Sequence, residues 1–177
     1  MATCCHGKHA PVTLTAPWRK LVLLLHVTSS VGFIGAVAAV LALAVTGVAT
    51  RENGLATGAY LAMRVVTWDV IVPLAFASLV IGIVQSLGTP WGLVRYYWII
   101  IKLVLTIFAV AVLMLQTQTV DALWAAASAG DLASYGGAKF SMVLHGTGGL
   151  LVLIVANVLS VFKPRGMTRY GAAQLSP

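Results

Sequence analysis

Three polar side chains that can hold a cofactor fall at a similar depth in strongly apolar segments of this sequence. His26, Lys102 and Asn157 each lie about 8–10 Å inside one end of their segment, at the rise of a helical residue. A neutral imidazole is a common axial ligand of haem iron and also binds copper, and an ammonium group can bind a haem propionate or another anion. We therefore predict a cofactor site here, with His26 as the ligand of haem b or of a metal and with Lys102 and Asn157 beside it.

Each of these residues also has a purely structural interpretation. His26 can be a buried histidine that bonds a neighbouring carbonyl or Asn157. Lys102 stands near the start of its segment, and helical side chains lean toward the helix N-terminus, so its ammonium can reach the membrane interface instead. The sequence leaves both interpretations open.

A second set of candidate ligands lies toward the opposite end of the apolar segments. Met63, Met114, Met142 and His145 would form a soft set suited to Cu(I), although methionine is also common packing material. Because His26 and His145 are separated by roughly 16 Å along the helix axes, one haem cannot take both as ligands. A copper site with Met142 and His145 among its ligands is therefore an alternative to haem binding.

Asp69 is a further candidate at this second end. Pro73 has no backbone N–H for the carbonyl of Asp69 four residues earlier. The freed carbonyl, the carboxylate and His145 can bind a cation or relay a proton. The alternative is a structural pair of Asp69 with Arg64 or His145 that holds two helices together.

The N-terminal Cys4, Cys5, His6 and His9 offer another soft donor set. Adjacent cysteines match none of the usual zinc spacings, so a solvated tail is the competing prediction. These two cysteines are the only ones in the chain, and they form no disulfide framework.

The composition predicts that lipid, and not water, surrounds the elements that carry these residues. Of the 177 residues, 60% are hydrophobic and 8% are charged, against about 25% charged in an ordinary soluble domain. The net charge of +7 does not indicate nucleic-acid binding, because the basic residues punctuate apolar runs and do not cluster with aromatic residues.

Four apolar runs predict an all-α membrane protein, a bundle of four transmembrane helices over 21–162. The first run is too long for the apolar region of a signal peptide, so we expect it to be retained. A short surface helix is expected at 120–128, and tails at 1–20 and 163–177. The predicted spans are 21–49, 65–87, 96–115 and 141–162.

The distribution of charge predicts that both termini are cytoplasmic, in a multi-pass protein of the bacterial inner membrane. Basic residues are concentrated in the two tails and the middle loop, at Lys8, Arg19, Lys20, Arg95, Lys163, Arg165 and Arg169. The opposite side holds fewer basic residues and all four acidic ones, namely Arg51, Arg64, Lys139, Glu52, Asp69, Asp121 and Asp131.

Small residues form a stripe along the first predicted helix, at Thr28, Gly32, Gly35 and Ala39. Such a stripe lets another helix approach closely. The neighbour can belong to the same bundle, to a second copy in a homodimer, or to a partner in a membrane complex.

Single residues in all four segments form a recognisable pattern: Leu25-His26 with Gly35, Met63-Arg64, Pro73, Gly82, Trp98 with Lys102, and Val161-Phe162-Lys163-Pro164. In these residues the chain resembles a family of small four-helix bacterial membrane proteins of uncharacterised function. More distantly, it resembles the copper-resistance D and HemJ-type protoporphyrinogen oxidase proteins.

The resemblance implies that His26 is a haem ligand and that Arg64 and Lys102 are charge partners for a porphyrin. It also implies an aromatic stretch and a second histidine soon after His26 in the first helix, and an acidic neighbour of Asn157, and this chain has none of these. The predicted topology further places Arg64 and Lys102 at opposite ends. We therefore take the resemblance to indicate haem binding and not porphyrinogen oxidation.

The sequence supports three functional hypotheses. The first is a small membrane protein that binds haem b through His26 and takes part in redox chemistry. The second is a copper-handling protein that uses Met142 and His145. The third is a non-catalytic accessory or assembly subunit whose polar residues hold helices together. The sequence contains no hydrolase triad, nucleotide-binding loop or closed zinc site that would point to a specific enzyme.

Overall fold

The computed structural model describes residues 15–88, 93–162, 164 and 166–168. Within those ranges the chain forms four long helical segments and no strand, which confirms the prediction of an all-α four-helix protein. The first segment is α1 (Ala16–Ala49), and the second runs without a break through α2 (Asn53–Val65), η1 (Val66–Ile71) and α3 (Val72–Leu87). The third is α4 (Tyr97–Ala129), and the fourth is η2 (Ala133–Tyr135) followed by α5 (Gly136–Phe162).

Each of the four segments is long and apolar enough to cross a membrane. They contain 30 to 35 residues, which is about 45–53 Å of helix against a hydrocarbon core of about 30 Å. The second segment begins at Asn53, twelve residues before the predicted start at 65. The prediction missed these residues because 53–64 is less apolar than the rest of the segment.

The prediction of a separate surface helix at 120–128 was wrong. These residues continue α4, which runs unbroken to Ala129. No glycine or proline interrupts the sequence between Tyr97 and Ala129, so nothing in the backbone stops the helix earlier. It ends where Gly130 takes the left-handed conformation, with φ of 76°.

Pro73 is accommodated by a π-helical turn and not by a break in the helix. Residues Val66–Ile71 form this turn, η1, and the N–H of Val72 bonds the carbonyl of Thr67, five residues earlier. A π turn of this kind inserts an extra residue into the helix and changes the direction of the side chains around it. Here it carries Thr67 and Ile71 into the bundle, where both are buried.

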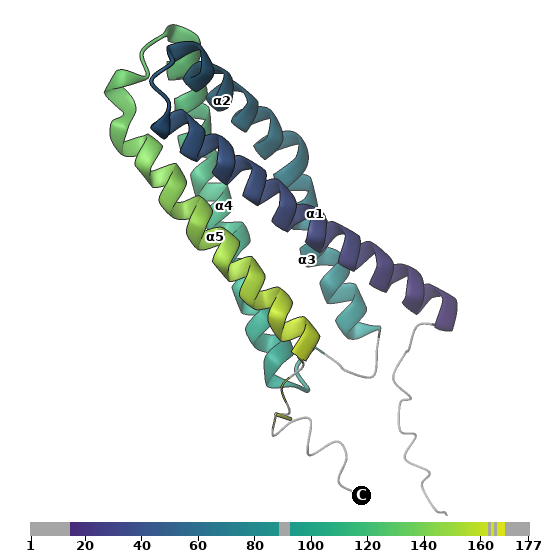
Figure 1. Cartoon of the computed structure of the whole chain (residues 1–177). Helices are drawn as coiled ribbons and strands as arrows, with labels where there is room; N and C mark the ends of the chain where they lie inside the picture. Colours follow the sequence, from purple (N-terminus) through teal and green to yellow (C-terminus); the bar gives the residue numbers. More distant parts are fainter. Residues whose placement is uncertain (1–14, 89–92, 163, 165, 169–177) are drawn as a thin grey trace, which may run out of the picture.

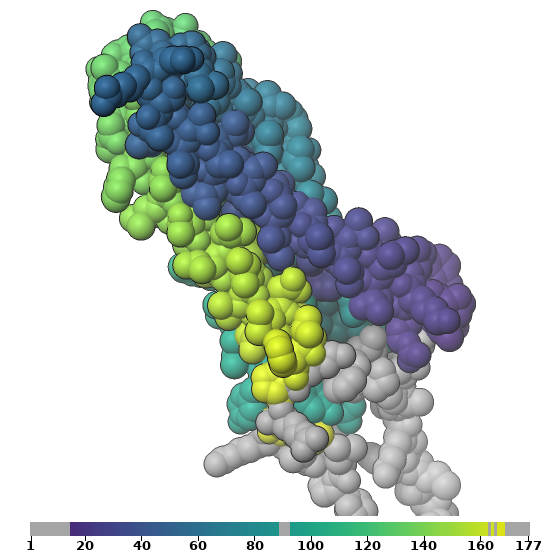
Figure 2. All heavy atoms as spheres, viewed as in Figure 1, coloured from purple at the N-terminus to yellow at the C-terminus, as the bar shows by residue number. Residues whose placement is uncertain are grey.

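Figure 1 shows the start of α1 and the end of α5 at one end of the bundle, which we call the lower end, and the connection from α1 to α2 at the upper end. Helix α1 contacts α2, α3 and α5, and α4 contacts α2 and α5. In Figure 2 the surfaces of α1 and α5 meet in the upper part of the molecule and diverge toward the lower end.

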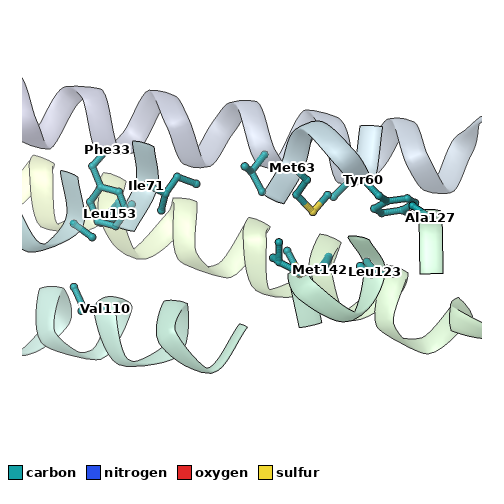
Figure 3. Close-up of a cluster of buried hydrophobic side chains, with 13 residues drawn as sticks. Phe33, Tyr60, Met63, Ile71, Val110, Leu123, Ala127, Met142 and Leu153 are labelled. Carbon is teal, nitrogen blue, oxygen red and sulfur yellow. The ribbon is translucent and has the colours of Figure 1, made fainter. Parts of the chain in front are cut away.

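The core is densest near the upper end. Tyr60 and Met63 of α2 are almost completely buried there, beside Leu123 of α4 and Met142 of α5 (Figure 3). The Tyr60 ring lies against Gly47 of α1, where any side chain would collide with it. This glycine lets α1 and α2 approach closely after the short turn between them.

At the lower end, the segment that follows α5 returns to the start of α4. Met167 forms an isolated antiparallel bridge with Tyr96. The backbone N–H of Thr168 donates to the Arg95 carbonyl at 2.9 Å, and its hydroxyl donates to the Val94 carbonyl at 2.7 Å. Most of the predicted tails, including Cys4, Cys5, His6 and His9, lies outside the described residues.

Two glycines of α1 test this packing. A Cβ at Gly47 would lie 2.5 Å from Cζ of Tyr60, whose ring is 1% exposed and has no free space to move into. We expect Gly47→Ala to overpack the core by about 1–3 kcal/mol and to lower the melting temperature by about 2–12 °C. The measurement is thermal unfolding of the detergent-purified protein.

Gly35→Ala is the matched control, because no atom lies within 4 Å of a Cβ at that position. It should leave stability unchanged or raise it by about 0.5–1 kcal/mol, since alanine favours helix over glycine. Equal melting temperatures for the two variants would contradict the close α1–α2 contact.

Candidate functional site

The lower half of the bundle contains a polar cavity of about 180 Å³, which we call the lower cavity. Helices α1, α3, α4 and α5 all contribute to its wall. The three residues predicted to lie at one depth, His26, Lys102 and Asn157, line it together. They come from three different helices, so only the tertiary structure brings them to one place.

His26 and Lys102 contact each other directly. Nζ of Lys102, on α4, lies 3.2 Å from Nε2 of His26, on α1, in the wall of the lower cavity. The predicted alternative in which Lys102 extends to the membrane interface is therefore not the conformation found. His26 is 9% exposed, so the pair is largely shielded from the surroundings.

Lys102 has no carboxylate partner among the described residues. The one ion pair found there joins Arg64 to Asp121 near the upper end. The four acidic residues of the sequence lie in the α1–α2 turn, in η1, in the upper part of α4 and just after α4. A cation held in an apolar bundle attracts an anion, so the lower cavity favours a ligand that carries a negatively charged group.

The imidazole of His26 is held by close packing against α3. A Cβ at Gly82 would lie 2.9 Å from Cε1 of the ring, so only glycine leaves room for His26 in this orientation. Nδ1 is buried and makes no hydrogen bond of good geometry among the described residues, although the Ser78 backbone is close to the ring. Nε2 faces Lys102.

Hydroxyl and amide groups extend the polar wall beyond the predicted residues. Ser30 of α1 and Ser78 of α3 share a hydrogen bond of 2.8 Å, and Oε1 of Gln85 is buried without a partner in the described structure. Ser78 and Gly82 were not predicted as site residues. A comparison of depths could have found them, because they stand at the level of His26 in their own helices.

At the upper end, Arg64 joins α2 to α4. Its Nε donates to Oδ1 of Asp121 at 2.8 Å, Nε1 of Trp68 donates to the same oxygen at 3.2 Å, and the guanidinium lies 4.7 Å from the centre of the Trp124 ring. Arg64 therefore pairs with Asp121. The pair of Asp69 with Arg64, which was the structural alternative, is not formed. Arg64 and Lys102 belong to separate sites.

Asp69 and His145 do not pair with each other. Asp69 is exposed, and no hydrogen bond or ion pair is found for it within the described ranges. Nδ1 of His145 lies 2.8 Å from the backbone carbonyl of Ser141 on its own helix. No group of three or more His, Cys, Asp or Glu side chains that could hold a metal occurs in the described part of the chain.

A second cavity of about 420 Å³, the upper cavity, lies between α1, η1, α4 and α5. Met142 and His145 both line it, whereas Met63 is buried in the core and Met114 lies outside the lining. The predicted soft ligand set is thus only partly assembled. Phe33 and Leu153, side by side in Figure 3, line both cavities and separate them.

The lower cavity offers the donor groups that haem b needs, under two conditions. His26 supplies an imidazole and Lys102 a cation for a propionate. However, Nζ of Lys102 stands where iron would approach Nε2, so Lys102 must turn away first. The cavity is also smaller than the roughly 300–1,000 Å³ of typical ligand pockets, so the helices around it must move apart.

No protein-family model, no curated protein and no solved structure matches this chain. The interpretation of the site therefore depends on its own residues and their geometry.

A double-mutant cycle tests whether the contact between His26 and Lys102 stabilises the folded protein. Either His26→Leu or Lys102→Met alone leaves one buried polar group without its partner, at a cost of about 1–3 kcal/mol, and should lower the melting temperature by about 2–12 °C. The double variant removes both groups, so we expect it to be at least as stable as the wild type. Thermal unfolding of the four proteins gives the coupling energy.

Ser86→Ala is the control, because the Ser86 hydroxyl bonds the Gly82 carbonyl of its own helix and joins no second helix. It should change stability little. A double variant less stable than either single variant would mean that the pair serves to lock α1 to α4, as expected for an accessory subunit.

Proposed function

We propose that this chain is a small multi-pass protein of the bacterial inner membrane that binds haem b in its lower cavity and takes part in membrane redox chemistry. The observation that carries the proposal is the convergence of His26, Lys102 and Asn157, from three helices, on one cavity between the helices. Groups so costly to place among apolar helices are expected to have a function.

Insertion into a membrane is supported by the surface of the bundle. Large apolar side chains are exposed along all four helical segments, for example Leu24 on α1, Phe76 on α3, Phe108 on α4 and Leu151 on α5. An apolar surface of this extent is not compatible with water on all sides.

The charges at the two ends support a topology with both termini in the cytoplasm. In this proposal the lower end, with Arg19, Lys20 and Arg95, faces the cytoplasm. The upper parts of the helices extend beyond the hydrocarbon core, and Trp68 and Trp124 lie at the interface, next to the Arg64–Asp121 ion pair.

The residues of the lower cavity have distinct proposed roles. His26 provides Nε2 as the iron ligand, and the packing against Gly82 fixes the plane of its ring. Lys102 would turn away from His26 and supply the charge that neutralises a propionate. The amide of Asn157 and the Ser30–Ser78 pair offer hydrogen bonds near by. Bound haem would supply one-electron transfer.

Copper handling receives less support. Only Met142 and His145 of the predicted soft set line one cavity, and Cu(I) sites ordinarily use more ligands than two. Asp69 is exposed and does not complete the set.

The haem proposal predicts an absorption spectrum. Protein purified in detergent from cells supplied with a haem precursor should show a Soret band that sharpens on reduction with dithionite. His26→Ala should remove at least about nine-tenths of it, because the axial ligand is lost. His145→Ala is the matched control, since His145 does not line the lower cavity.

Lys102 adds a second measurement to the same experiment. If Lys102 binds a propionate, Lys102→Met should weaken haem retention severalfold, in line with the loss of one charge-assisted hydrogen bond. A folded wild-type protein with a featureless spectrum would contradict haem binding.

The topology predicts which positions impermeant reagents reach. With Cys4 and Cys5 replaced by serine, Glu52→Cys in the α1–α2 turn should react with a membrane-impermeant maleimide added to cells whose outer membrane is permeabilised. Val94→Cys, exposed at the lower end, should react only after the inner membrane is opened as well. The reverse pattern would show that the termini lie outside.

A further inference from the structure

The upper cavity has the features of a second ligand site, and we propose that it binds an isoprenoid quinone, an uncharged lipid-soluble ring that carries carbonyl oxygens. The cavity measures about 420 Å³, within the range of roughly 300–1,000 Å³ that is typical of small-molecule sites. This proposal does not depend on haem binding in the lower cavity.

Two buried polar groups in the wall of the upper cavity lack partners. Oγ1 of Thr67 and Oε1 of Gln116 are both inaccessible, and no hydrogen bond is found for either within the described residues. Thr67 is 2% exposed. Buried hydroxyl and amide groups are nearly always paired, and a ligand can supply the missing hydrogen bonds once a change of rotamer turns these two oxygens toward the cavity.

Thr67 differs from three threonines of α4 and α5 in what its hydroxyl bonds. The hydroxyls of Thr106, Thr117 and Thr147 each donate to a carbonyl three or four residues earlier on their own helix, as threonine ordinarily does there. Thr67 makes no such bond, and it lies in the π-helical turn η1. Turns of this kind are frequent at functional sites because they redirect side chains.

The remaining lining determines what kind of molecule fits. Apart from Met142 and His145, it consists of aliphatic and aromatic side chains with glycines, including Val37, Ile71, Phe108, Val112, Gly148 and Gly149. No Lys, Arg, Asp or Glu is among the lining residues, so an ionised ligand would find no counter-charge.

Gly148 and Gly149 leave room for a flat ring on the α5 side of the upper cavity. No atom lies within 4 Å of a Cβ built at either position, and Gly148 is exposed on the surface of the bundle. A ring can therefore enter from the lipid between α4 and α5, with its apolar tail still in the membrane.

The hydrogen-bonding groups distinguish a quinone from a lipid chain. The Thr67 hydroxyl can donate to a ring carbonyl, and the Gln116 amide can donate to a carbonyl or accept from a hydroxyl. An acyl chain would fill the space but would leave Thr67 and Gln116 unpaired. The ring would lie next to Phe33 and Leu153, which separate it from the lower cavity.

Binding can be measured by tryptophan fluorescence. A ubiquinone analogue with a short saturated tail is titrated into the protein in phosphatidylcholine nanodiscs, where Trp68, next to Thr67, reports quenching. Wild-type protein should show a saturable component. Thr67→Val keeps the shape but removes the hydroxyl, so the dissociation constant should rise about three- to tenfold, the effect of losing one neutral hydrogen bond.

Two further variants complete the test. Thr117→Val is the matched control: Thr117 is also buried, but its hydroxyl bonds Met114 and it does not line the cavity, so binding should be unchanged. A Cβ at Gly149 meets no atom within 4 Å, so Gly149→Phe directs a ring into the open space and should abolish the saturable component. Equal affinity of wild type and Thr67→Val, or no saturable quenching of the wild type, would overturn the proposal.

Discussion

Polar groups inside an apolar bundle must find their partners within the bundle, and the arrangement of this protein depends on that constraint. With 8% charged residues and an apolar surface, the chain offers few alternatives to direct pairing between helices. His26 meets Lys102 between α1 and α4, and Ser30 meets Ser78 between α1 and α3. Such contacts fix the rotation of each helix about its axis more strictly than aliphatic packing does, because a turned helix would leave a polar group unpaired.

Four residues with a buried side-chain atom that lacks a hydrogen bond among the described residues line the two cavities, whereas Tyr60, whose hydroxyl is also unpaired, lies in the core. Nδ1 of His26 and the amide of Gln85 face the lower cavity, and Thr67 and Gln116 face the upper one. Phe33 and Leu153 line both cavities. A redox ligand in each would place an electron donor and an acceptor close together, as a small membrane redox protein requires. The two proposals support each other but are tested separately.

Much of the architecture could be predicted from the sequence, because it depends on local composition. Four apolar runs separated by charged or glycine-containing turns are enough to predict four helices, and charge alone predicts which ends lie together. The common depth of His26, Lys102 and Asn157 could also be predicted, since it depends only on the rise per residue. The continuation of α4 through 120–128 could not be predicted in this way. Polar residues such as Gln116 and Gln118 follow the apolar run, but the helix continues through them.

The sequence by itself therefore determined the number of helices, their apolar character and the depth of each polar residue. Tertiary structure decided which residues face one another, since depth along an axis says nothing about rotation around it. Lys102 contacts His26, Arg64 pairs with Asp121 and not with Asp69, and a π turn places Thr67 inside the bundle. In each case the direction of a polar side chain depends on contacts with another helix or on the path of its own backbone, and the spacing of residues in the sequence contains neither.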